Sequence, residues 1–297
     1  MVQDLVYRES GIRLGDHKGV LVTTRMGRRL RATGCTDIAE YLAWVQSPRG
    51  RSERAEFIDA ITTNETSFFR SPEHFDWFAD DYLPAIVTQS RLGQHAKRLK
   101  IWSAACSTGA EAFTLALLVQ RYGMRLAGWE IEILGTDISA TSVATARSGI
   151  VSPRLARTVP ETHRRRLFDP QTSDRGDYTI RGELQKAVRF EVRNLLNPPS
   201  DRGFHVVFLR NVLIYFDKDS KQRVMNHITR ALAPGGYLVV GQGEAIGHTE
   251  HALQRRLPFL FQKVDADASD ASGASDHSGN SDHSDHSDHS DHSGATS

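Results

Sequence analysis

The chain has 297 residues, of which 39% are hydrophobic and 25% charged, and its formal net charge is +1. These proportions are ordinary for a globular protein, and no apolar run approaches the roughly 20 residues that cross a bilayer. The two cysteines, Cys35 and Cys106, provide neither a disulfide framework nor the spacing of a metal centre. We therefore expect a cytoplasmic protein that is not inserted in a membrane and has no structural metal.

The charge of the chain is unevenly distributed. Residues 265–297 contain eight Asp and neither Lys nor Arg, so the remaining residues carry a formal charge of +9. A basic surface favours acidic partners, and the lack of a recognisable base-flipping or RNA-binding motif argues against nucleic acid. The tail consists mainly of Asp, Ser, His, Gly and Ala, which predicts disorder because these residues bury little apolar surface.

Residues 1–62 are predicted to form a helical domain. Apolar residues recur with the 3.6-residue period after Asp37, and Glu40 stands three residues later, as in a capping box. An earlier helix places four arginines on one broad face, namely Arg25, Arg28, Arg29 and Arg31. A solvated charged face and a partner-binding face explain this pattern equally well. Residues 63–100 are expected to form a linker that covers the ligand of the next domain.

Strand and helix patterns alternate from residue 101 onward, which predicts a doubly wound parallel sheet over 101–264. The predicted strands are 101–105, 131–136, 188–192, 204–209 and 236–241, with a closing strand over 259–264. Residues 151–186 interrupt the alternation with three prolines and one short β-like run. We interpret them as an inserted subdomain.

The most informative segment is the loop of small residues between the strand at 101–105 and the following helix. Small residues allow a ligand to approach the backbone, and a helix N-terminus offers free N–H groups. Asp137 ends the next predicted strand, where a carboxylate can accept hydrogen bonds from both ribose hydroxyls. The loop lacks the Gly-x-Gly-x-x-Gly spacing of pyrophosphate sites. It therefore predicts a ligand with adenosine but few phosphates, with S-adenosylmethionine (SAM) as the leading candidate.

Four separated motifs agree with this interpretation. They are Thr63-Asn-Glu-Thr-Ser-Phe-Phe-Arg70, Trp102-Ser-Ala-Ala-Cys-Ser-Thr-Gly-Ala-Glu111, the segment from Gly135 to Ile150, and Phe208-Leu-Arg-Asn-Val-Leu-Ile-Tyr-Phe-Asp217. Together they resemble the CheR-type chemotaxis receptor methyltransferases, which methylate glutamate side chains with SAM. The resemblance covers residues 5–264, in the order and spacing of that family.

The resemblance implies an α/β fold: a Rossmann-like SAM-dependent methyltransferase domain, a small all-α N-terminal domain and an inserted β-subdomain. Carried over by motif position, the SAM-binding residues are Asn64, Thr66, Arg70, Glu111, Asp137, Asn194, Leu195, Asn211 and Val212. Arg70 and Tyr215 are the predicted catalytic residues, at the face where the methyl group is transferred. The chemistry agrees, because an arginine fork suits a carboxylate and acids suit an amino group or hydroxyls.

The implied partners are the acidic methylation helices of chemotaxis receptors, and the arginine face at 25–31 is the predicted surface that binds them. The insert lacks the glycine-rich loop of family members that dock on a receptor pentapeptide, so tethering of that kind is not expected here. Some residues differ from the family pattern, among them Ala110, Ala112 and Gln242.

Other functions remain open from the residues alone. A SAM-dependent enzyme for another acceptor and a non-catalytic SAM-sensing adaptor both fit the same binding motifs. Several assigned residues also have structural alternatives: Asn64 and Asp137 suit helix caps, and Arg70 suits a surface ion pair.

Overall fold

The computed structural model describes residues 1–13, 19–62, 64–170, 176–197, 200–244, 246 and 252–264. The chain divides into two units, Met1–Val264 and Asp265–Ser297. The predicted disordered tail is the second unit and lies outside the described residues. No helix among the described residues is long and apolar enough to cross a membrane.

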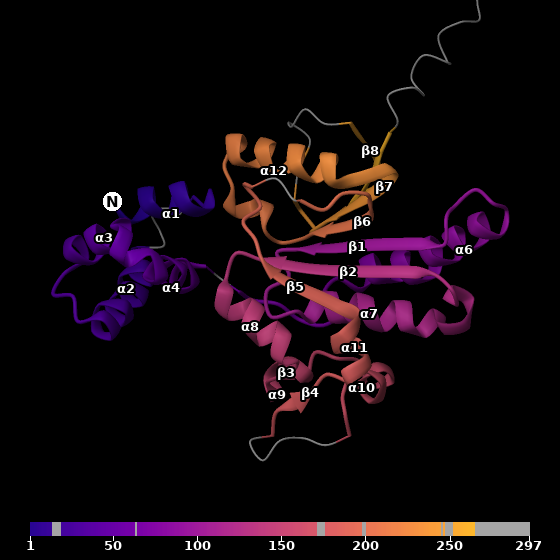
Figure 1. The fold of residues 1–297 in the computed structure, drawn as a ribbon, viewed down its shortest axis with the longest axis horizontal. Helices are drawn as coiled ribbons and strands as arrows, with labels where there is room; N and C mark the ends of the chain where they lie inside the picture. Colours follow the sequence, from indigo (N-terminus) through magenta and orange to yellow (C-terminus); the bar gives the residue numbers. More distant parts are fainter. Residues whose placement is uncertain are drawn as a thin grey trace, which may run out of the picture. The chain divides into compact units, whose positions relative to one another are not determined.

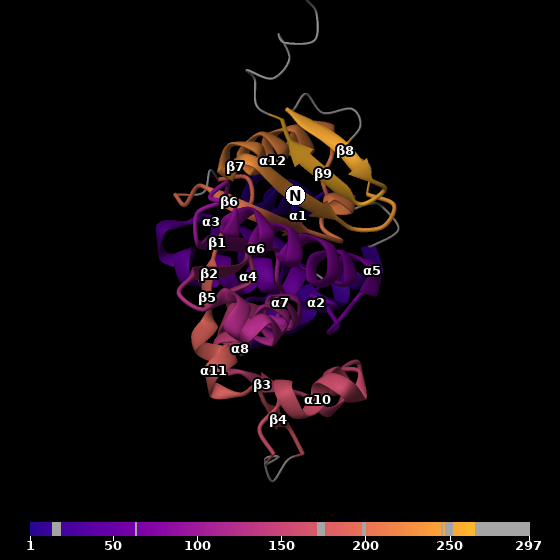
Figure 2. The same cartoon turned by 90° about the vertical axis from the view of Figure 1, so that its right-hand side faces the viewer.

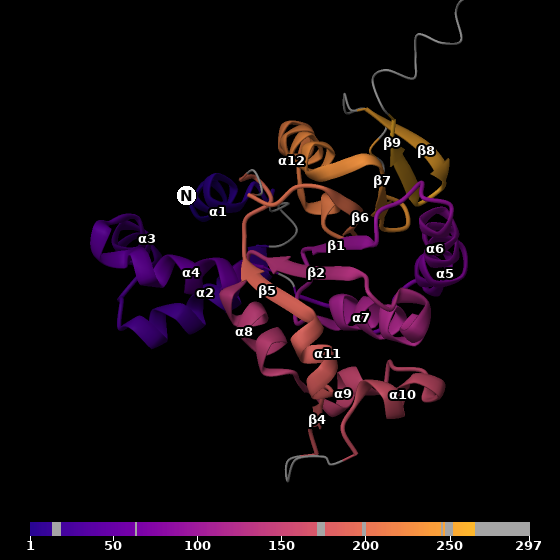
Figure 3. The ribbon, with the colours of Figure 1, turned by 45° about the vertical axis from the view of Figure 1, so that its right-hand side comes forward.

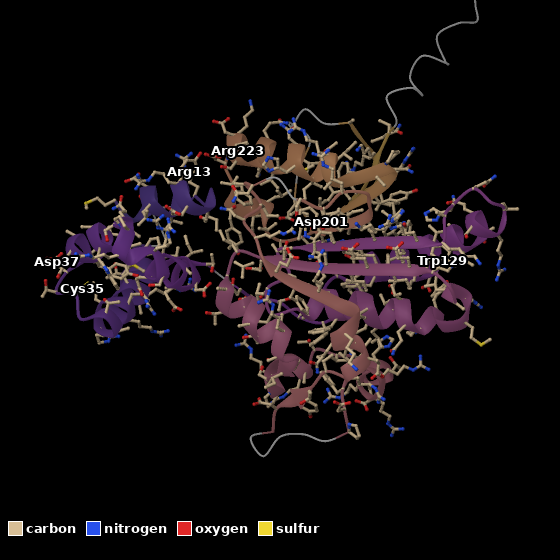
Figure 4. The ribbon with its side chains drawn as sticks, in the orientation of Figure 1. Arg13, Cys35, Asp37, Trp129, Asp201 and Arg223 are labelled. Atoms are coloured by element: carbon tan, nitrogen blue, oxygen red, sulfur yellow. The ribbon has the colours of Figure 1, made fainter. Side chains whose placement is uncertain are left out.

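The N-terminal domain is helical, as predicted (Figure 1). Its helices are α1 (Val2–Ser10), α2 (Gly19–Thr33), α3 (Ile38–Gln46) and α4 (Arg51–Ile61), with a 3-10 turn at Pro48–Gly50. Half of the expected capping box is present: the Asp37 carboxylate accepts from the Glu40 amide, but the Glu40 carboxylate accepts from the amide of Thr36, one residue before the cap. Asp37 lies at the start of α3 (Figure 4). A small apolar core that includes Leu5, Tyr41 and Phe57 joins the helices.

A seven-stranded sheet follows, with strand order β5-β2-β1-β6-β7-β9-β8. The strands are β1 (Arg98–Ala104), β2 (Glu130–Asp137), β5 (Val188–Val192), β6 (Phe204–Leu209), β7 (Leu232–Val240), β8 (Leu253–Leu257) and β9 (Leu260–Lys263). The first five are parallel, and β9 pairs antiparallel with both β7 and β8. Each predicted strand is present, whereas β8 was not predicted. β7 begins four residues before the predicted strand at 236–241, and its register with β6 shifts near its start.

Helices cover both faces of the sheet. Alternating strand residues point to opposite faces, so Ile101 and its neighbour Trp102 belong to different apolar clusters. One face packs against α5 (Pro72–Asp76), the π-helix Trp77–Tyr82, α6 (Leu83–Arg91), α7 (Ala110–Tyr122) and α8 (Ala140–Ser148). The other packs against α12 (Lys218–Ala231), on the opposite side of the sheet from α7 (Figures 1 and 3). Short 3-10 turns span Gly123–Leu126 and Leu213–Tyr215.

The insert contains less β-structure than predicted. Its strands, β3 (Ile150–Val151) and β4 (Tyr178–Thr179), form one two-stranded antiparallel pair. The rest of its described part is mainly helical: α9 (Pro153–Ala156), α10 (Glu161–Leu167) and α11 (Gly182–Ala187). Two of its three prolines, Pro153 and Pro160, open or precede a helix, a position that a proline without an N–H tolerates. β3, β4 and α10 of the insert lie beyond α8, away from β8 (Figure 2).

The sheet is tightly packed at Gly135, in β2. A Cβ there would lie 2.6 Å from the Phe190 ring. We expect Gly135→Ala to lower the free energy of unfolding by about 1–3 kcal/mol, because overpacking forces neighbours to move. Gly182→Ala is the matched control, since a Cβ there meets nothing within 4 Å. It should change stability by less than about 0.5 kcal/mol. Urea unfolding measures both, and a Gly135→Ala protein as stable as wild type would contradict the packing.

Candidate functional site

One pocket lies at the carboxyl ends of the parallel strands, where β1 and β2 point toward α1 and α4 (Figures 1 and 3). It is lined by the segments that follow β1, β2, β5 and β6, by residues of the linker, and by Ser10, Ile12 and Arg25 of the helical domain. Each SAM-binding residue assigned from sequence lines it, and so does Tyr215: Asn64, Thr66, Arg70, Glu111, Asp137, Asn194, Leu195, Asn211 and Val212. The topology therefore gathers motifs that are up to 151 positions apart.

The small-residue loop after β1 is held by the end of β2. Ser107 has a left-handed backbone, with φ of 51°, and its amide donates to the Asp137 carboxylate at 2.8 Å. The other Asp137 oxygen accepts from the Ser139 amide at 2.9 Å. Ser139 itself caps α8, so Asp137 supports the start of that helix without being its cap. Burial raises the pKa of the Asp137 carboxyl above its usual value.

Glu111, at the start of α7, forms a buried ion pair with Arg210, whose Nη1 lies 2.9 Å from Oε2. Ser103 donates to Oε1 at 2.7 Å. Arg210 also donates to the Arg70 carbonyl, and its guanidinium lies 5.2 Å from the centre of the Phe75 ring. Arg210 lines the pocket and was missed from sequence. The signal was present, because an arginine directly after the apolar strand β6 is rarely buried without a charged partner.

The first motif forms an irregular segment ahead of α5. Phe69 and Ser71 have left-handed backbones, with φ of 53° and 56°, and they flank Arg70. Arg70 is exposed, and its side chain donates to the Glu65 carbonyl rather than to an acid. The Asn64 carbonyl accepts from the Ser107 hydroxyl at 2.9 Å, and Asn64 caps no helix.

Asn194 joins the pocket to the helical domain. Its side-chain amide donates to the Glu9 carbonyl at 2.7 Å, at the end of α1, and its Oδ1 accepts from the Leu196 amide at 2.9 Å. The Asn194 side chain therefore makes structural contacts at the edge of the pocket. Leu195 lines the pocket beside it.

The segment after β6 carries Asn211, Val212 and Tyr215. Asn211 is left-handed, with φ of 58°, and its amide donates to the buried carboxylate of Glu244 at 2.7 Å. The Tyr215 carbonyl accepts from the Arg13 amide, and Arg13 lies near the end of α1 (Figure 4). The sequence interpretation assigned no role to Glu244.

The four arginines of α2 do not act as one surface. Arg29 forms ion pairs with Glu53 and Glu56 of α4. The Glu53 carboxylate also accepts a hydrogen bond from the Tyr41 hydroxyl. Burial, followed by the contact with Glu53, raises the Tyr41 pKa well above its usual value. Arg25 donates to two carbonyls at the end of α4 and lines the pocket. Arg28 and Arg31 are exposed.

Comparison with known proteins agrees with this architecture. Residues 64–257 match the family model described as the CheR methyltransferase SAM binding domain, and residues 1–62 match the CheR methyltransferase all-alpha domain. A probable chemotaxis protein methyltransferase of Rhizobium etli is 32% identical over 252 residues, which cover 84% of this chain and 93% of that protein. The chemotaxis protein methyltransferase of Escherichia coli is 34% identical over 273 residues, 91% of this chain and 90% of that protein. The chain belongs to the CheR family of SAM-dependent methyltransferases.

Proposed function

We propose that this enzyme transfers the methyl group of SAM to glutamate side chains of chemotaxis receptors. The products are γ-glutamyl methyl esters and S-adenosylhomocysteine. The names of the relatives support a chemotaxis substrate, and the chemistry of the pocket supports a carboxylate acceptor.

The lining residues fit SAM at both of its ends. Asp137 presents a buried carboxylate for the ribose hydroxyls, and Glu111 presents one for the amino group. Arg70 presents an exposed guanidinium for the methionine carboxylate. Asn64, Thr66, Asn194, Leu195, Asn211 and Val212 complete the proposed SAM site. When bound there, SAM supplies a methyl group activated by a positively charged sulfur.

A glutamate acceptor suits this pocket because it needs no base. Its usual pKa is about 4.3, so the carboxylate is ionised at neutral pH. No histidine is present among the lining residues that the structure describes. Those residues include four arginines, Arg25, Arg70, Arg193 and Arg210, against three acids. The task of the protein is to align the carboxylate with the methyl group and exclude water, and alignment alone supplies several kcal/mol. Tyr215 lines the pocket and is the proposed residue at the methyl-transfer face.

The exposed arginines of α2 are the proposed receptor contacts. Arg28 and Arg31 are exposed on α2, and Arg25 of the same helix lines the pocket. An acidic receptor helix on this surface lies close to the site of methyl transfer. Tethering through the insert is not part of the proposal, and the corresponding segment, 169–176, lies largely outside the described residues.

The observation that carries the proposal is one pocket lined by all of the assigned SAM-binding residues and by Tyr215. The direct test incubates the protein with methyl-labelled SAM and a receptor cytoplasmic fragment, and measures volatile methanol after base treatment. We expect methanol, because base hydrolyses a carboxyl methyl ester. Label that survives base would show N- or S-methylation and overturn the glutamate acceptor. Transfer that fails while S-adenosylhomocysteine binds would overturn the receptor substrate.

Asp137→Ala should weaken S-adenosylhomocysteine binding about tenfold to a hundredfold, since hydrogen bonds to a charged group contribute about 1.5–3 kcal/mol. Because burial raises the Asp137 pKa, the wild-type affinity should fall as the pH is lowered through that raised value, and the variant should lack this component. Calorimetric titration across pH measures both. Asp37→Ala, which removes the α3 cap, is the control and should keep the affinity. Equal affinities in Asp137→Ala and wild type would refute the assignment.

Reversing the charge of the exposed α2 arginines should weaken receptor binding alone. For Arg28→Glu with Arg31→Glu we expect the receptor KM to rise about threefold to tenfold at low salt, because each exposed charge contact contributes up to about 1 kcal/mol. S-adenosylhomocysteine affinity should not change. Arg91→Glu with Arg125→Glu makes the same charge change near the amino ends of β1 and β2 and serves as the control. If both double variants change the receptor KM by the same factor, the proposed docking surface is wrong.

A further inference from the structure

Backbone strain in this protein is concentrated around the pocket. Among the described residues, the non-glycine positions with positive φ are Phe69, Ser71, Ala105, Ser107 and Asn211. They belong to the three segments that carry Arg70, the small-residue loop and Asn211. Such conformations cost about 1–3 kcal/mol each and persist only where surrounding contacts enforce them. Each segment therefore requires something that holds it.

The segment after β6 is held by one carboxylate. Oε2 of Glu244 accepts from the amides of Asn211 and Gly241, both at 2.7 Å, and Oε1 accepts from the Leu213 amide at 2.8 Å. Glu244 is 7% exposed and lies in the loop that follows β7. It is absent from the pocket lining, so it acts on the pocket only through the backbone that it binds.

Gly241 provides the space for this carboxylate. A Cβ at position 241 would collide with Oε2 of Glu244 and lie 2.9 Å from the Asn211 amide nitrogen. The glycine is needed here for close approach, since its φ is not positive. Gly241 and Glu244 therefore form one unit, in which the first residue leaves room for the side chain of the second.

Two of the amides that bind Glu244, those of Asn211 and Leu213, lie in the stretch that ends at Tyr215. Val212 lies between Asn211 and Leu213. The 3-10 turn that ends at Tyr215 begins at Leu213. Asn211, Val212 and Tyr215 all line the pocket. The carboxylate binds the backbone on both sides of Val212, at Asn211 and at the start of the turn that leads to Tyr215, so it restricts the position of this stretch. An error of 1 Å at a reacting group costs about a hundredfold in rate.

We propose that Glu244 is a positioning residue for methyl transfer: it holds the left-handed Asn211 and sets the place of Tyr215. The proposal rests on the proposed role of the pocket in methyl transfer. Its chemistry requires a carboxylate, because three N–H donors converge on two oxygens. A glutamine would turn an NH₂ group toward at least one of these donors and leave it unpaired.

The test compares Glu244→Gln with wild type in the full chain. Calorimetric titration with S-adenosylhomocysteine gives the dissociation constant and the fraction of binding-competent sites, and turnover on a receptor fragment is then expressed per competent site. We expect a competent fraction near that of wild type, a dissociation constant raised about threefold or more, and a kcat lowered about tenfold or more. If Glu244 were only structural, Glu244→Gln would lower the fraction of competent sites but leave the dissociation constant and the kcat per competent site unchanged. That result would overturn the proposal.

Two further variants complete the design. Gly241→Ala keeps the carboxylate but displaces it, so it should reproduce the kinetic defect even if Glu244→Gln fails to fold, and wild-type constants in this variant would also overturn the proposal. Glu53→Gln makes the same chemical change at another carboxylate that is 7% exposed, in the helical domain. It should lower the melting temperature and keep the S-adenosylhomocysteine affinity. A wild-type protein that binds S-adenosylhomocysteine but does not turn over would contradict the proposed receptor substrate. The dissociation constants of the variants would still test the role of the Glu244 carboxylate.

Discussion

The buried ion pair between Arg210 and Glu111 is the interaction on which the site depends. It joins the end of β6 to the start of α7, and its arginine also binds the backbone of Arg70. Burying two charges is costly unless each finds further partners. Here Ser103 and the Arg70 carbonyl supply them, and the Phe75 ring adds a favourable aromatic contact. Three segments that are distant in sequence are thereby brought to one wall of the pocket.

The helical domain also lines the pocket, so it is part of the candidate site rather than an appendage. Asn194 binds the Glu9 carbonyl, Arg13 binds the Tyr215 carbonyl, and Asp59 of α4 accepts from the Thr141 amide at the start of α8 at 2.9 Å. These contacts tie α1 and α4 to the loops that carry the proposed ligand groups. The same domain provides the exposed arginines, so one small domain contributes both to the pocket and to the proposed receptor surface.

The strained loops explain why the pocket needs polar groups that hold its backbone in place. Ser107 is held by Asp137, Asn211 by Glu244, and Phe69 by the Thr114 hydroxyl together with a stack on His163 of the insert. Each holding residue comes from a different part of the fold. Preorganisation of this kind removes the cost of ordering the loops when a ligand binds, so part of the folding energy maintains the shape of the pocket.

The sequence by itself determined the elements and the motifs, because these depend on local patterns. The alternation of strand and helix patterns predicted the parallel strands, Asp37 with Glu40 predicted the start of α3, and four motifs indicated the family and its cofactor. Only the tertiary structure decided the partners of charged residues. Arg29 meets acids 24 and 27 positions away, and Arg210 meets Glu111 across 99 positions. Such pairs leave no periodic trace in the sequence, since they arise only when packing brings distant segments into contact and removes water from between them.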